Sequence, residues 1–107
     1  MELQPKFDTA TRNVMNFREE LFIASENVIA ARVKLETAKY ELLRSGKIDG
    51  KNAEIREAQT AEALTAEYKE LHDAEAKERL AKMNFDVAMF ELDNAKYSLR
   101  IAELAKV

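Results

Sequence analysis

The 107-residue chain contains no cysteine and no tryptophan, one proline and two glycines. Without cysteine it can form neither a disulfide nor a thiolate metal site, which suits a reducing compartment. It lacks an apolar run of about 18 residues, the length needed to span a membrane. Its first residues also lack the apolar segment of a signal peptide. These absences predict a cytoplasmic protein without membrane contact.

Neither sign of charge predominates, because charged residues make up 35% of the chain and the net charge is only −3. Proteins dedicated to duplex nucleic acid usually carry a basic excess, so nucleic acid is not expected as the main partner. His72 is the only histidine, which excludes a metal site with two histidine ligands within one chain. We therefore expect no enzymatic activity, no metal and no cofactor.

Alanine, glutamate, lysine and leucine are abundant, as in long helices and coiled coils. Pro5 suits a first helical turn, and nothing from Phe7 onward breaks a helix before Ser45 and Gly46. Two apolar series of period seven form the a and d positions of a heptad pattern and predict a helix over residues 7–45. These series are Phe7, Val14, Leu21, Val28, Leu35 and Leu42, and Ala10, Phe17, Ala24, Ala31 and Ala38.

A second helix is predicted over residues 52–106, where neither glycine nor proline occurs. Its heptad series are Leu64, Leu71, Phe85, Leu92 and Leu99, and Ala74, Ala81, Ala88, Ala95 and Ala102, with Glu78 as a polar interruption. Two helices joined by a short turn, here residues 46–51, pack antiparallel. The predicted fold class is therefore all-α: one helical domain, 1–107, built as a long coiled-coil-like antiparallel hairpin.

Both helices carry a further apolar series, although a helix with one neighbour needs only one apolar face. In the first helix this series lies roughly 150° around the axis from the heptad seam. The two series are Met15, Phe22, Ile29, Val33, Tyr40 and Leu43, and Leu80, Met83, Val87, Phe90, Asn94, Tyr97, Ile101 and Leu104. From them we predict an oligomer seam made of Phe22, Ile29, Val33, Phe90, Tyr97, Ile101 and Leu104.

The predicted helices also differ in length, at about 58 Å and about 80 Å. The first would cover the second only to about residue 90, which leaves Phe90, Leu92, Tyr97, Leu99, Ile101 and Leu104 in water. One solution is a homo-oligomeric helix bundle. The other is a break near His72–Asp73 that gives a three-helix bundle within one chain. The lack of glycine and proline favours the first.

The two glycines stand in the turn. Gly46 follows the last heptad residue, at the C′ position where a left-handed conformation ends a helix, and Asp49 or Asn52 can cap the next helix. A phosphate-binding Walker loop requires G-x-x-x-x-G-K-[ST] after a strand. The sequence G-x-x-x-G-K-N after a helix does not meet that requirement, so we interpret the segment as a turn.

The segment G-K-I-D-G-K-N-A-E-I-R-E-A resembles a motif of short all-helical proteins encoded by phages and prophages, in which it joins two long charged helices. The matching positions are Gly46, Ile48, Gly50, Lys51, Asn52, Ala53, Glu54, Arg56 and Ala58. The resemblance covers about 13 residues and implies a phage or prophage setting, with no activity to carry over.

A basic tip formed by Arg44, Lys47, Lys51, Asn52 and Arg56 is the candidate interaction site at the turn. Its residues either stabilise the loop or contact a partner. The function that the sequence favours is a non-enzymatic helical assembly protein, homo-oligomeric or bound to a host or phage protein. The alternative is an accessory factor of phage replication or recombination whose tip contacts nucleic acid phosphate.

Overall fold

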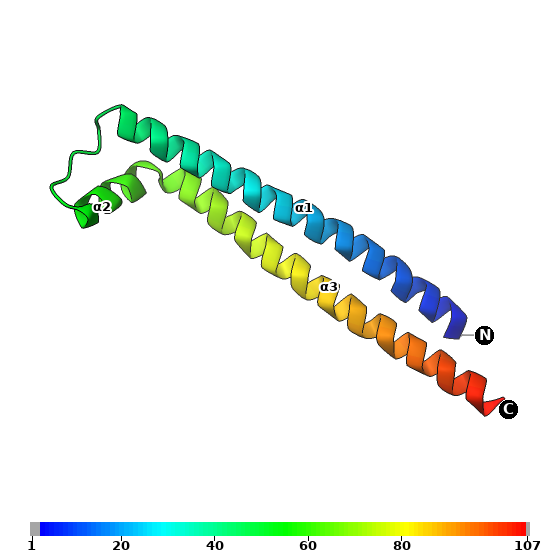
Figure 1. Ribbon diagram of the computed structural model, residues 1–107. Coiled ribbons are helices and arrows are strands. Elements are labelled where there is room, and N and C mark those ends of the chain that lie inside the picture. Colours follow the sequence, from blue (N-terminus) through cyan, green and yellow to red (C-terminus); the bar gives the residue numbers. More distant parts are fainter. Residues whose placement is uncertain (1–2, 107) are drawn as a thin grey trace. The chain divides into compact units, whose positions relative to one another are not determined.

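The computed structural model describes residues 3–106, which form three helices and no strand. Helix α1 spans Leu3–Arg44, α2 spans Ala53–Ala63 and α3 spans Thr65–Ala105 (Figure 1). The predicted all-α class is confirmed. The helices contribute to two compact units: a terminal unit of residues 3–23 with 78–106, and a central unit of residues 24–77. Within each unit α1 and α3 run antiparallel (Figure 1).

The core of the terminal unit consists of the predicted heptad residues. Ala10 and Val14 of α1 are buried with Ala88 and Leu92 of α3. Around them pack Phe7, Phe17, Phe85, Met89 and Ala95. The small alanine side chains allow the two helix backbones to approach closely, while the larger residues fill the space between them.

The central unit buries the continuation of the same seam. Val28, at 2% exposure, and Leu35, at 3%, are its most buried large side chains, accompanied by Ala24, Ala31 and Leu64. Two ion pairs join α1 to α3 at the surface, from Lys34 Nζ to Glu70 at 2.7 Å and from Arg32 to Glu75 at 3.7 Å. Exposed pairs of this kind add little stability, so apolar burial holds this unit together.

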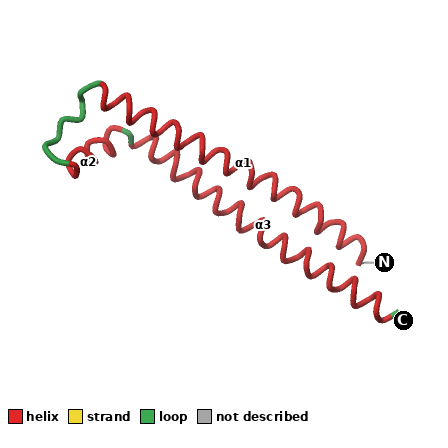
Figure 2. The backbone as a smooth tube through the Cα atoms, viewed as in Figure 1, coloured by secondary structure: helices red, strands yellow, loops and turns green. Residues whose placement is uncertain are grey.

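Helix α1 begins before the predicted start at residue 7 and ends one residue before the predicted end at 45. Pro5 lies in the first turn of α1, where the missing N–H of proline leaves no helical hydrogen bond unmade. The loop that follows covers residues 45–52 (Figure 2), close to the predicted turn at 46–51.

The prediction of one uninterrupted helix over residues 52–106 is wrong, because the chain leaves the helical conformation at Leu64, with φ −112° and ψ 31°. The single hydroxyl proton of Thr65 is shared between the carbonyls of Glu62, at 2.9 Å, and Ala61, at 3.2 Å, which are acceptors at the end of α2. The break considered near His72–Asp73 does not occur, since α3 is continuous there.

The break also corrects the expected mismatch in helix length. Helix α1 has 42 residues and α3 has 41, because α2 takes up the residues that would have made the second helix longer. Leu92 is accordingly buried and Leu99 half-buried in the terminal unit, although both were expected in water. Phe90, Tyr97, Ile101 and Leu104 are exposed as expected. No helix within the described residues is long and apolar enough to cross a membrane.

Candidate functional site

The tip begins at the end of α1, where Gly46 has φ +75°. This left-handed conformation, expected from the position of Gly46 after the last heptad residue, is confirmed, and glycine adopts it without steric cost. The Ser45 hydroxyl donates to the carbonyl of Leu42 at 2.6 Å and accepts from the N–H of Lys47 at 3.3 Å. The Ser45 hydroxyl thus both donates and accepts within the turn.

The second half of the loop is closed by side chains of α2. Asn52 is the N-cap of α2, and its side-chain oxygen accepts from the N–H of Ile55 at 2.9 Å. Arg56 donates to the carbonyl of Gly50 at 3.2 Å. A side chain at position 50 would lie 2.5 Å from Cγ2 of Ile55, so this close approach requires glycine.

Gln59 also holds this loop, and sequence reasoning missed it. Its amide oxygen accepts from the N–H of Gly50 at 3.0 Å, and its amide nitrogen donates to Asp49 at 3.0 Å. The spacing of nine or ten residues has no local signature in the sequence, because the contact depends on α2 folding back over the loop. Asp49 was considered as a possible cap of the second helix, and it accepts a hydrogen bond from Gln59 instead.

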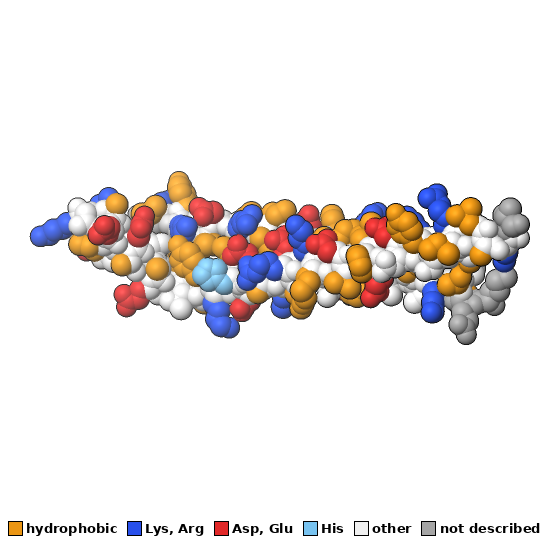
Figure 3. All heavy atoms as spheres, turned by 90° about the horizontal axis from the view of Figure 1, so that it is seen from below, with side chains coloured by type: hydrophobic (Ala, Val, Ile, Leu, Met, Phe, Trp, Pro, Cys, Tyr) orange, Lys and Arg blue, Asp and Glu red, His pale blue; other side chains and the backbone are white. Residues whose placement is uncertain are grey.

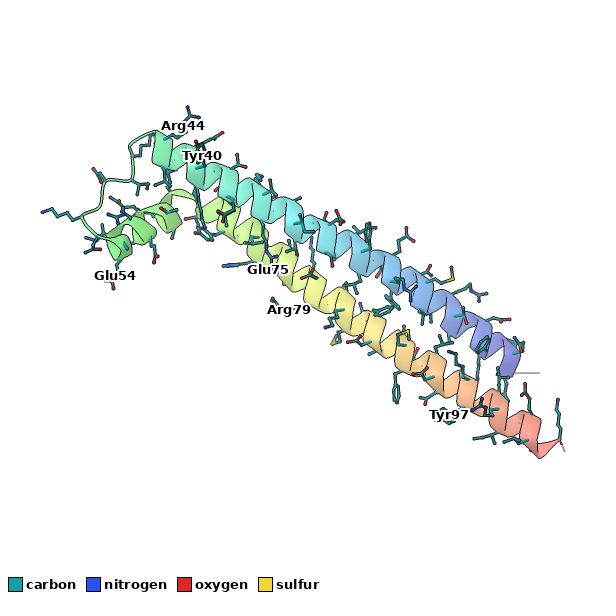
Figure 4. All side chains as sticks on the ribbon, viewed as in Figure 1. Tyr40, Arg44, Glu54, Glu75, Arg79 and Tyr97 are labelled. Carbon is teal, nitrogen blue, oxygen red and sulfur yellow. The ribbon has the colours of Figure 1, made fainter. Side chains whose placement is uncertain are left out.

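The predicted tip residues therefore divide into two groups. Asn52 and Arg56 have structural tasks within the loop. Arg44 lies 5.8 Å from the centre of the Tyr40 ring (Figure 4), in cation–π range. Lys47 and Lys51 are exposed. Phosphate contact by these cations stays a prediction.

Substituting Asn52 with alanine should destabilise the chain by about 1 kcal/mol, because one N–H at the start of α2 loses its acceptor. Asn52→Asp keeps the acceptor and should remain close to wild type. Chemical denaturation followed by circular dichroism measures both variants. Equal stability of Asn52→Ala and wild type would mean that this cap does not hold the loop.

The predicted oligomer seam is exposed throughout. Its members expose between 53% and 69% of their surface, and they are Phe22, Ile29, Val33, Phe90, Tyr97, Ile101 and Leu104. Phe22 and the four α3 residues belong to the terminal unit, and Ile29 and Val33 belong to the central unit. Figure 3 shows apolar side chains at the molecular surface between charged ones.

The ion pair between Lys34 and Glu70 affects the ionisation of the lysine. Glu70 raises the pKa of Lys34 above 10.5, first through its hydrogen bond and second through its charge. Because the cation is the bonded form, this interaction is present below pH 10.5 and is lost as pH rises through the raised pKa. His72 is exposed, with its ring 6.4 Å from that of Tyr68. Within residues 3–106 no group of three or more metal-ligating side chains could hold a metal ion.

No family model matches the chain, and no curated protein or solved structure matches it either.

Proposed function

We propose that this protein is a non-enzymatic helical assembly protein whose partner is a second copy of itself. The observation that carries the proposal is the exposure of large apolar side chains along helices whose other faces already form a core. Within the described residues these exposed side chains include Met15, Phe22, Ile29, Val33, Tyr40, Leu80, Met83, Val87, Phe90, Tyr97, Ile101 and Leu104.

Apolar surface on this scale is unusual for a protein that stays alone. Monomeric soluble proteins rarely expose contiguous apolar patches of more than a few hundred Å². Burying several such side chains gains several kcal/mol at about 25 cal/mol per Å², enough to contribute substantially to association. The turn motif adds the expectation that the assembly works in a phage or a prophage.

The proposal predicts that stability depends on protein concentration. When folded chains associate, mass action favours the folded state as concentration rises, so the midpoint of thermal unfolding should rise by several degrees over a roughly 100-fold increase in concentration. Circular dichroism at 222 nm in cells of different path length measures this midpoint. A midpoint that stays constant over this range would contradict self-assembly.

A further inference from the structure

The outer stripe of α3, defined as Leu80, Met83, Val87, Phe90, Asn94, Tyr97, Ile101 and Leu104, has the strict spacing of a second heptad seam. Leu80, Val87, Asn94 and Ile101 take the a positions, and Met83, Phe90, Tyr97 and Leu104 take the d positions. The stripe lies wholly within the terminal unit. At 100° per residue it is about 160° around α3 from the core seam, so the core helix of the same chain does not cover it.

The stripe is large enough to support an interface. Its seven apolar side chains are between 51% and 69% exposed, which amounts to roughly 700 Å² of apolar surface at typical side-chain areas. Specific, stable interfaces bury about 600–1,000 Å² per partner, and the stripe falls within that range. Around Met83, Val87 and Phe90 the surface forms a shallow, mainly apolar hollow, of the kind that receives a side chain from a facing helix.

The surface that best matches the outer stripe is the same stripe of a second copy. A seam of period seven packs against a helix of the same period, with each side chain inserted between four of the partner. In the terminal unit, the outer face of α1 offers a poorer match. There the charged residues Arg12 and Glu19 alternate with Met15 and Phe22 along the heptad positions of that face.

Asn94 selects the orientation of the pair. In a parallel, in-register pair the amide of Asn94 meets the amide of Asn94 from the second copy, so each can donate and accept. In the antiparallel pair that aligns all eight layers, Asn94 instead faces Phe90, which offers no hydrogen bond. A buried amide without a partner is costly, and a single asparagine at an a position is known to fix register.

The flanking charges oppose this orientation only weakly. In the parallel pair Asp86 approaches Glu91 of the second copy, and the carboxylates repel each other. Both carboxylates lie at the exposed rim of the seam, where solvent screens them. In the antiparallel arrangement the unpaired amide of Asn94 would lie in the dry centre of the seam. The free-energy cost of burying it there exceeds the screened repulsion between the two carboxylates of the parallel pair.

Resting on the self-assembly proposed above, we infer that two chains join through a parallel coiled coil of their α3 outer stripes, with the two Asn94 side chains paired. The α1 helices of the two terminal units then lie on opposite outer sides of the α3 pair. The stripe thereby sets both the number of chains and their relative direction.

The absence of native cysteine makes disulfide trapping in the full chain a clean test of direction. Leu104→Cys should give a covalent dimer under mild oxidation on a non-reducing gel, because a parallel pair brings the two positions 104 together. Lys96→Cys, exposed on α3 outside the stripe, should give little. A disulfide that forms only when Leu80→Cys and Leu104→Cys chains are mixed would show an antiparallel pair and overturn the inference.

Asn94 supplies the second readout. Asn94→Leu removes the polar pair and should tighten self-association at least about ten-fold while the fixed direction is lost. Lys96→Leu is the matched control, and it should change the dissociation constant less than about two-fold. Equal effects of the two substitutions would overturn the role of Asn94.

Sedimentation equilibrium of the same samples separates the two proposals. A monomer at every concentration overturns the self-assembly along with the coiled coil. An assembled chain that fails the disulfide and Asn94 tests overturns the coiled coil alone.

Discussion

Val28→Asp should abolish the folded state, the largest loss of stability expected from any single substitution in this chain. Val28 is 2% exposed and lies in the core of the central unit, and no polar side chain is buried in the described residues. The carboxylate would therefore have no partner to compensate the loss of water. We expect a cost of at least about 4 kcal/mol, comparable with the whole stability of a small domain, about 5–15 kcal/mol.

Circular dichroism during urea titration measures this loss. Asn27→Asp adds the same acid at the exposed neighbouring position and should stay within about 0.5 kcal/mol of wild type. Val28→Ala should cost about 2 kcal/mol and remain folded. A cooperative transition of Val28→Asp at the wild-type urea concentration would show that the heptad seam is not the core.

Phe90→Glu combined with Ile101→Glu should prevent association while the helices remain folded. The two side chains are 66% and 64% exposed in the single chain, so replacing them costs the isolated fold little. In an assembled state each pair of chains would have to bury four carboxylates in an apolar seam. We expect the dissociation constant to rise at least about 1000-fold, equivalent to about 4 kcal/mol.

The matched control adds the same charge elsewhere. Asn27→Glu combined with Thr37→Glu places two carboxylates at exposed positions of α1 outside the apolar series. If this control dissociates as readily as the α3 variant, net charge rather than the outer stripe governs association. Light scattering coupled to size-exclusion chromatography reports the mass of both variants, and circular dichroism verifies that both are helical.

The heptad pattern predicted the core because side chains at its a and d positions lie on one face of a helix, and an apolar face is buried against a neighbouring helix. Val14, Val28, Leu35 and Leu92, all members of the predicted series, are buried in the structure. The end of α1 and the cap of α2 were also predictable. Left-handed backbone favours glycine at position 46, and an N-cap requires a short acceptor side chain such as that of Asn52.

The break at Leu64 was not predicted, because neither glycine nor proline marks it. A signal does exist, since the core series begins only at Leu64 and Ile55 is the one large apolar residue of Ala53–Ala63. Helix α2 accordingly buries none of its residues. The bonds of Gln59 to the loop depend on how α2 folds back and could not be read from local spacing.

The seam and tip residues were predicted from the sequence as candidates for binding a partner. The structure adds which of them already make contacts within the chain. Arg56 and Asn52 are used within the loop. The residues of the outer stripe have no counterpart packed over them in the single chain, as their exposure shows. The pattern of a single sequence predicts which face of a helix is apolar, but it does not identify the molecule that binds that face. The partner therefore has to be established by measurement.

The most direct test is the molar mass of the wild-type chain in solution, determined by sedimentation equilibrium over a wide range of concentration. Self-assembly predicts a mass that rises with concentration to twice the 12.2 kDa of one chain, or to a higher multiple. A mass that stays at 12.2 kDa up to the highest soluble concentration would contradict it, because the exposed apolar stripes would then have no tendency to bring copies together.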